Sequence, residues 1–209
     1  MRLNPFAMVN KEEVYKKVER MRRQYPHLSE RELCDLIIAE KSRLCGLTGA
    51  LTALPATFPV IGTAVTLIGG TAVDMAAVSY FMAQMVLEMS AVYGRDLNLP
   101  GVSREAVWVM ASAVGADVAN KTVSKAAVRQ MGNQAFVRLV QELLKTLGIR
   151  ATQRTVLRII PLLGAVISGT INYFICRRVG RIAADYYARN SWTGHDGEGA
   201  IDVEGEVVE

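Results

Sequence analysis

The chain has 209 residues, of which 51% are hydrophobic and 21% are charged. This composition excludes a mainly disordered chain, and the length fits one domain or two small ones. Three cysteines are too few for a disulfide framework, and two histidines without a cysteine cluster argue against a zinc site. We therefore expect no metal and no cofactor.

The formal net charge of +4 conceals an asymmetry between the body of the chain and its C-terminal end. Residues 191–209 contain six acidic residues and no Lys or Arg; the rest holds all 24 Lys and Arg with the other 14 acidic residues, a charge of +10. A basic body favours anionic partners. Aromatic residues make up only 7% and are not interleaved with Lys and Arg, so we expect anionic lipid rather than nucleic acid.

The N-terminal part reads as a charged helix. We expect residues 1–10 to be a loose lead-in, followed by an amphipathic helix over residues 11–24 with Val14, Val18 and Met21 on one face. The first 23 residues lack the apolar core of a secretory signal. We therefore expect a cytoplasmic protein with reduced thiols.

A second helix is predicted to begin after Ser29, whose spacing from Glu32 is that of a capping box. No charged residue occurs from Leu44 to Val73, a stretch interrupted by two prolines. Beyond this break we predict one long helix from about Val60 to Val92, with Gly94 as its left-handed cap.

The remaining segments also favour helices. Residues 98–101 read as a turn, Ser103 as the N-cap of the next helix, and residues 134–147 as a further amphipathic helix. Pro161 suits the first turn of a final helix that ends near Tyr187. Since no segment alternates with period two, we predict an all-α, multi-helix bundle whose centre is a pair of Gly/Ala-rich apolar helices, the long helix and the final one.

We divide the chain into an N-terminal charged helix (1–28), a helical domain (29–190) and an acidic tail (191–209). The tail combines its acidic residues with four glycines, so it buries too little apolar area to fold alone. We therefore predict that it is disordered.

Two blocks of the chain resemble the EcsC protein family. The first runs from Asp74 to Gly94 around Met82-Ala-Gln-Met85; the second is Pro161–Asn172, followed by Arg-Val-Gly-Arg-Ile-Ala from Arg178. The same blocks are similar to the related YcjF-like domain of unknown function, and the resemblance covers roughly residues 40–187. It implies an all-α protein linked to bacterial membranes in an accessory role, and it supplies no catalytic residues.

The apolar helices allow three placements. A membrane span needs about 20 consecutive apolar residues, whereas Val60–Val73 is shorter and is followed by Asp74. Ile159–Cys176 is borderline in length and contains a proline. Small residues at four-residue spacing, such as Ala165 and Gly169, suit both a membrane helix pair and a tight soluble bundle. The two apolar helices can therefore be buried in a soluble domain, inserted shallowly in a membrane, or span it fully, and the sequence leaves these three placements open.

Asp74 is a lone carboxylate between two long uncharged stretches. A buried ionised carboxylate without a partner is very unfavourable, so it must pair, accept backbone N–H bonds or be protonated. We predict a buried polar anchor that pairs with Arg177 or Arg181 of the final helix, or bonds to Asn172 or Tyr173. Lining a ligand cavity and catalysis are the alternatives.

Basic residues recur every four positions in residues 121–129 and again in residues 150–158, so each set forms a stripe along one face of a predicted helix. Each stripe adjoins apolar helix, which is the pattern of an interfacial helix on anionic lipid, although a solvated face is the alternative. The predicted lipid- or anion-binding residues are Lys121, Lys125, Arg129, Arg150, Arg154 and Arg158.

Other reactive residue types have structural interpretations. The serines show no Gly-x-Ser-x-Gly motif, and the glycine pairs lack the Gly-Lys-Ser/Thr of a phosphate loop. We expect Asp117 to pair with Lys121 and Asp185 with Arg181, each four residues away. The three cysteines are expected to be small core residues.

These patterns favour a non-catalytic protein. We expect it to be cytoplasmic and peripherally associated with, or partly inserted in, the inner membrane. Its expected partner is anionic membrane lipid or a membrane protein. The alternative is a soluble helical module that holds a hydrophobic ligand, such as a lipid chain, between its helices.

Overall fold

The computed structural model describes residues 5–53, 64–114, 135, 138–139 and 161–190. In this part of the chain every regular element is a helix, which confirms the all-α bundle. The elements are α1 (Pro5–Met8), α2 (Lys11–Gln24), α3 (Glu30–Ala53), α4 (Ala64–Val92), α5 (Pro100–Val114) and α8 (Pro161–Asn190).

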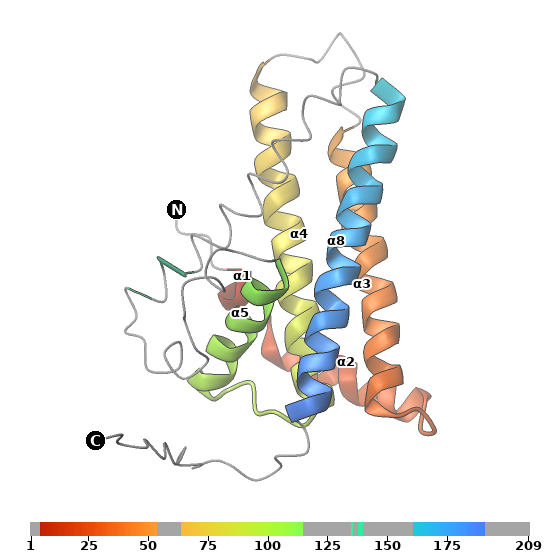
Figure 1. The fold of residues 1–209 in the computed structure, drawn as a ribbon, viewed down its shortest axis with the longest axis vertical. Coiled ribbons are helices and arrows are strands. Elements are labelled where there is room, and N and C mark those ends of the chain that lie inside the picture. Colours follow the sequence, from red (N-terminus) through yellow and green to blue (C-terminus); the bar gives the residue numbers. More distant parts are fainter. Residues whose placement is uncertain (1–4, 54–63, 115–134, 136–137, 140–160, 191–209) are drawn as a thin grey trace, which may run out of the picture.

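Three long helices, α3, α4 and α8, stand side by side and form the body of the bundle (Figure 1). The direction of α3 is opposite to that of α4 and α8. The short helices α1, α2 and α5 pack beside the half of the bundle that contains the end of α4 and the end of α8. The other half of the three long helices extends beyond them.

Local sequence explains where the first helices begin. The Asn10 side chain caps α2 by accepting hydrogen bonds from the backbone of Glu12 at 3.0 Å and Glu13 at 3.3 Å. The capping box predicted before α3 is present, because Glu32 accepts from the Ser29 backbone at 2.8 Å and Ser29 Oγ accepts from the Glu32 backbone at 3.3 Å. These side chains satisfy backbone donors that have no partner inside the helix.

The end of α4 also follows the prediction. Gly94 has φ of 73°, the left-handed conformation that glycine adopts without strain. Its N–H donates to the carbonyl of Ala91 at 3.0 Å, and the next N–H, of Arg95, donates to Ser90 at 3.0 Å. The chain thereby turns sharply out of α4 towards α5.

Two expectations about helix starts were wrong. Residues 5–8 are not a loose lead-in but form α1, because Phe6 and Val9 are apolar enough to be buried in the core. Ser103 is not the N-cap of α5, which begins three residues earlier at Pro100. Proline suits the first helical position because its φ is already helical and its missing N–H has no partner there.

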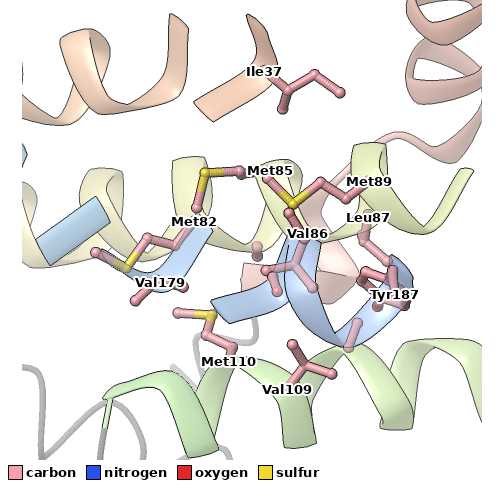
Figure 2. Close-up of a cluster of buried hydrophobic side chains, with 14 of the residues drawn as sticks. Ile37, Met82, Met85, Val86, Leu87, Met89, Val109, Met110, Val179 and Tyr187 are labelled. Atoms are coloured by element: carbon pink, nitrogen blue, oxygen red, sulfur yellow. The ribbon is translucent and has the colours of Figure 1, made fainter. Parts of the chain in front are cut away.

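The core lies where α4 meets the other helices, and methionine is prominent in it (Figure 2). Met82, Met85 and Met89 of α4 are fully buried, as is Met110 of α5. Around them lie Ile37, Val179 and Tyr187, which come from α3 and α8. Unbranched thioether side chains fill the irregular gaps between helices that meet at different angles.

The cysteines are core residues, as predicted. Cys34, Cys45 and Cys176 are all fully buried, free thiols. Burial raises the pKa of Cys34 to about 12, so this thiol is protonated and unreactive at neutral pH.

Glycines let α3 and α8 approach closely. A Cβ built on Gly169 would lie 2.8 Å from the carbonyl oxygen of Gly46, and one on Gly49 would lie 2.5 Å from Asn172 Nδ2. A Cβ at Gly169 therefore meets backbone and does not fit without movement of the helices, whereas a Cβ at Gly49 first displaces the Asn172 side chain. The sequence indicated Gly169 as a close-approach residue, and the helix that approaches it is α3.

None of the helices in the described ranges is both long enough and apolar enough to cross a bilayer.

Replacing Gly169 by alanine is expected to destabilise the protein by about 1–3 kcal/mol, since the new methyl group meets backbone that has no room to yield. Gly101→Ala is the matched control, because a Cβ at this position of α5 has nothing within 4 Å. Thermal unfolding followed by circular dichroism measures both variants. Equal midpoints for Gly169→Ala and wild type would show that the helices separate at little cost.

Candidate functional site

One half of the α3–α8 pair carries no charge. Charged residues are absent from Leu44 to Ala53 on α3 and from Pro161 to Cys176 on α8. Gly46 faces both Gly169 and Tyr173, so these two uncharged stretches lie side by side in the antiparallel pair. They occupy the half of the bundle that extends beyond α1, α2 and α5 (Figure 1).

Large apolar side chains of this half are exposed. Leu47 and Leu51 on α3 are 59% and 62% exposed, and Val166 and Phe174 on α8 are 64% and 60% exposed. Leu47 and Leu51 are one turn apart, and Val166 and Phe174 are two turns apart, so each pair follows one side of its helix. Helical geometry places both pairs on the side of the α3–α8 contact turned away from α4. We call these four residues the apolar patch.

Three arginines lie on the same side of α3 and α8 as the apolar patch, directly beside its end at Leu47 and Phe174. Arg43 precedes Leu47 by one turn on α3, and Arg177 and Arg181 lie on the same stripe of α8 as Phe174. Arg43 and Arg181 are exposed and Arg177 is half-buried. Among the residues that the structure describes, none of the three forms an ion pair. We call them the arginine belt.

Tyr173 holds one member of the belt in place. Arg177 Nη1 donates a hydrogen bond to the Tyr173 hydroxyl at 3.2 Å, and the guanidinium carbon lies 6.0 Å from the centre of the Tyr173 ring. The Tyr173 ring in turn meets Phe174 edge to face at 5.4 Å. The apolar patch and the arginine belt therefore meet at a pair of aromatic rings.

A second polar feature is an ion-pair cluster of Lys17, Glu40, Lys41 and Glu88, which joins α2, α3 and α4. Lys17 Nζ lies 2.7 Å from Glu40 and 3.0 Å from Glu88. Lys41 Nζ lies 3.0 Å from the other oxygen of Glu88 and 3.6 Å from Glu40. Among the described residues Glu88 Oε1 has no hydrogen-bond partner, so its contact with Lys41 is an ion pair alone. Each charge thus has two neighbours of opposite sign.

Burial makes this cluster important for the fold. Glu88 is 0% exposed and Lys41 is also buried, while Lys17 and Glu40 reach solvent. Partial burial disfavours the charged form of Lys17, but Glu88 and Glu40 outweigh this effect and raise its pKa. Burial likewise disfavours ionised Glu40, but Lys17 and Lys41 outweigh it and lower its pKa. The cluster is neutral overall, and we assign it a structural role.

Further polar contacts fasten α2 to the bundle. The Tyr15 hydroxyl donates to Asp96 at 3.1 Å and accepts from the Leu97 backbone at 2.6 Å. Arg22 Nη2 donates to the carbonyl oxygen of Val92 at 2.5 Å. These contacts tie α2 to the end of α4 and to the segment that follows it.

Aromatic residues form a third cluster where α5 meets α8. The Tyr186 hydroxyl donates to the buried Glu105 carboxylate at 2.5 Å, and its ring lies 5.6 Å from Trp108. Tyr93 stacks on Tyr187 at 6.3 Å, and burial raises the pKa of both phenols, that of Tyr93 to about 12. Both phenols are therefore neutral at physiological pH and act as packing residues with a polar tip.

The structure leaves the predicted lipid-binding stripes untested, because Lys121, Lys125, Arg129, Arg150, Arg154 and Arg158 lie outside the described residues, as do Asp117 and the tail. Asp74 falls within α4, but its side chain is also outside the described part. Its role as a buried polar anchor therefore stays a prediction.

One predicted ion pair was wrong. Asp185 pairs with Arg31 near the start of α3, not with Arg181 on its own helix. The antiparallel arrangement brings the start of α3 beside the end of α8, and a cation four residues before an acid is the weaker order within a helix. Arg181 is therefore exposed and does not pair with Asp185.

Sequence reasoning also missed Glu88. It is the sole charged residue between Asp74 and Arg95, and that isolation was the signal that marked Asp74 as buried and partnered. The arginine belt was missed for a different reason. Its members come from two helices, and the register between those helices is visible only in the structure.

Neither a family model, nor a curated protein, nor a solved structure matches this chain. In the described ranges no three His, Cys, Asp or Glu side chains are arranged to hold a metal ion. The apolar patch and the arginine belt are therefore the features on which we base a function.

Replacing Glu88 by alanine is expected to cost about 3–5 kcal/mol, because it leaves Lys41 buried without its closest counter-ion. Glu12→Ala removes the exposed Glu12–Lys16 pair and serves as the control, with no measurable change expected. Urea unfolding measures both variants. If Glu88→Ala unfolds at the wild-type urea concentration, the cluster contributes nothing to stability.

The lowered pKa of Glu40 predicts a loss of stability in acid. Ionised Glu40 stabilises the fold above its ordinary pKa of 4.5, and this contribution disappears as pH falls through the lower folded value. The thermal midpoint, measured at successive pH values from 6 downwards, should therefore begin to decrease once the pH is below about 4.5. In Glu40→Gln this fall should be shallower; an unchanged slope would place the acid sensitivity in other carboxylates.

Proposed function

We propose that this protein is a non-catalytic, membrane-associated accessory protein that binds an anionic lipid surface through the apolar patch. The observation that carries the proposal is the exposure of Leu47, Leu51, Val166 and Phe174 together on one uncharged face. Isolated exposed apolar residues are ordinary, whereas a contiguous group marks an interaction site. A lipid surface is a suitable partner because the patch is flanked by cations.

Charge supports the same partner. The body of the chain carries +10, and the arginine belt concentrates part of this charge beside the apolar patch. Apolar side chains next to Lys and Arg are the pattern of peripheral segments on anionic leaflets. We further propose that the two basic stripes predicted from the sequence add to this attraction, and that the resemblance to the EcsC family reflects a shared membrane setting at the cytoplasmic face.

Vesicle flotation tests the proposal. Wild type is expected to float with phosphatidylcholine vesicles containing phosphatidylglycerol, and binding is expected to fall as salt rises, since exposed charges are screened over about 8 Å at 0.15 M. Leu47→Gln with Leu51→Gln is expected to weaken binding at least tenfold, because partial burial of two leucines contributes more than about 1.4 kcal/mol.

The matched control is Met8→Gln with Leu99→Gln, which changes two side chains that are 58% and 56% exposed outside the patch. This control should bind as wild type does, and both double variants should keep the wild-type thermal midpoint. Failure of wild type to float with any vesicle would refute the proposal. A lipid that copurifies with a protein indifferent to vesicles would instead favour the soluble ligand-binding module.

A further inference from the structure

We infer that the arginine belt binds the phosphate groups of anionic phospholipids and so fixes the depth and tilt at which the apolar patch enters the bilayer. The inference rests on the proposed function, and it adds the recognised chemical group and the orientation of the molecule. It is carried by three features: the register of α3 and α8, the unpaired state of the belt among the described residues, and the aromatic support of Arg177.

The register places the belt immediately beside the patch. Gly46 faces Gly169 and Tyr173, and Gly180 faces Ile38, so Arg43 lies at nearly the level of Arg177. From there, Leu51 and Val166 lie about 12–16 Å further along the helix axes, given a rise of 1.5 Å per residue. Along the helix axes, the surface of α3 and the surface of α8 therefore change from cationic to apolar at nearly the same height.

The lengths fit entry into one leaflet. An apolar stretch of about 12–16 Å is roughly half the 30 Å hydrocarbon core of a bilayer. The exposed side chains lie on the flank of the helices, and interfacial helices bury such a flank about 5–10 Å deep. A tilted molecule therefore places the apolar patch below the phosphates and the arginine belt among them.

The chemistry of the belt suits phosphate. A guanidinium group offers a planar fork of N–H donors that binds two phosphate oxygens at once. The acidic residue one turn before Arg43, Glu40, is already engaged by Lys17 at 2.7 Å and therefore leaves Arg43 available. Asp185, one turn beyond Arg181, is likewise paired with Arg31.

Tyr173 prepares Arg177 for this role. Its hydroxyl accepts the hydrogen bond from Arg177 Nη1 at 3.2 Å and restricts the guanidinium before any ligand arrives. Tyrosine rings favour the boundary between the hydrocarbon and the headgroups, because one end is apolar and the other is polar. Tyr173 lies at that boundary between the patch and the belt.

Charge removal tests the belt. The variant Arg43→Gln, Arg177→Gln, Arg181→Gln is expected to lose about a hundredfold in affinity for vesicles with phosphatidylglycerol, since each cation near an anionic surface contributes about fivefold. Binding to pure phosphatidylcholine vesicles should change little. The control Lys11→Gln, Arg20→Gln, Arg189→Gln removes the same charge elsewhere and should lose less than about fivefold.

Depth is measured with a polarity-sensitive label on single cysteines. The native thiols are buried, so an introduced surface cysteine is labelled selectively in the folded protein. Labels at Leu51→Cys and Phe174→Cys should shift to shorter emission wavelength on vesicles, whereas a label at Met8→Cys should not. In the belt variant at saturating lipid, the shift at Phe174→Cys should diminish as the molecule loses its fixed tilt.

The outcomes separate the two proposals. If wild type prefers anionic vesicles and the patch labels report insertion, but the belt variant binds and inserts as wild type does, the belt inference fails and the proposed function stands. If wild type binds no vesicle, both fail. A soluble dimer that Leu47→Gln with Leu51→Gln returns to monomer would assign the patch to a second copy of the chain and overturn both.

Discussion

The close contact between α3 and α8 is the constraint on which the rest of the molecule depends. Glycines at positions 46, 49 and 169 remove the side chains that would keep the two helices apart. The resulting approach fixes the register of the pair, and the register decides which side chains share a level. Because van der Waals attraction falls steeply with separation, backbones this close also gain contact along their length. The surface that we connect with lipid is therefore a consequence of glycine packing within the bundle.

The two halves of the bundle are stabilised in different ways. In the half covered by α1, α2 and α5, a neutral ion-pair cluster and the hydrogen bonds of Tyr15 and Arg22 hold α2 against α4 and the segment that follows it. In the other half, α3 and α8 meet through small residues such as Gly46, Gly49 and Gly169. A buried ion pair adds little net stability over apolar packing but penalises arrangements that separate its charges. The cluster thus specifies where α2 lies, while the uncharged half keeps its outer face apolar.

The sequence predicted helices well wherever local chemistry decides the structure. The bounds of α2, the capping box at Ser29 and the left-handed Gly94 all depend on neighbouring residues, and all are confirmed. Expectations that depended on distant residues were less successful: the partner of Asp185 is on another helix, and Glu88 gains its importance from two lysines that lie far away in sequence. The arginine belt is likewise a property of register, which no single helix encodes.

The methionine-rich core around α4 has a mechanical consequence. Thioether chains have several rotatable bonds and low torsional barriers, so they accommodate a sliding neighbour that branched side chains would block. Met82, Met85 and Met89 line α4 on the side of the core, whereas α3 and α8 meet at glycines, where no side chain separates the two backbones. The three long helices are therefore packed in two ways: α3 and α8 meet through their backbones, while α4 meets its neighbours largely through flexible thioether side chains. If α3 and α8 bind a lipid surface as we propose, changes of methionine rotamer would let α4 adjust to that contact while the core stays filled.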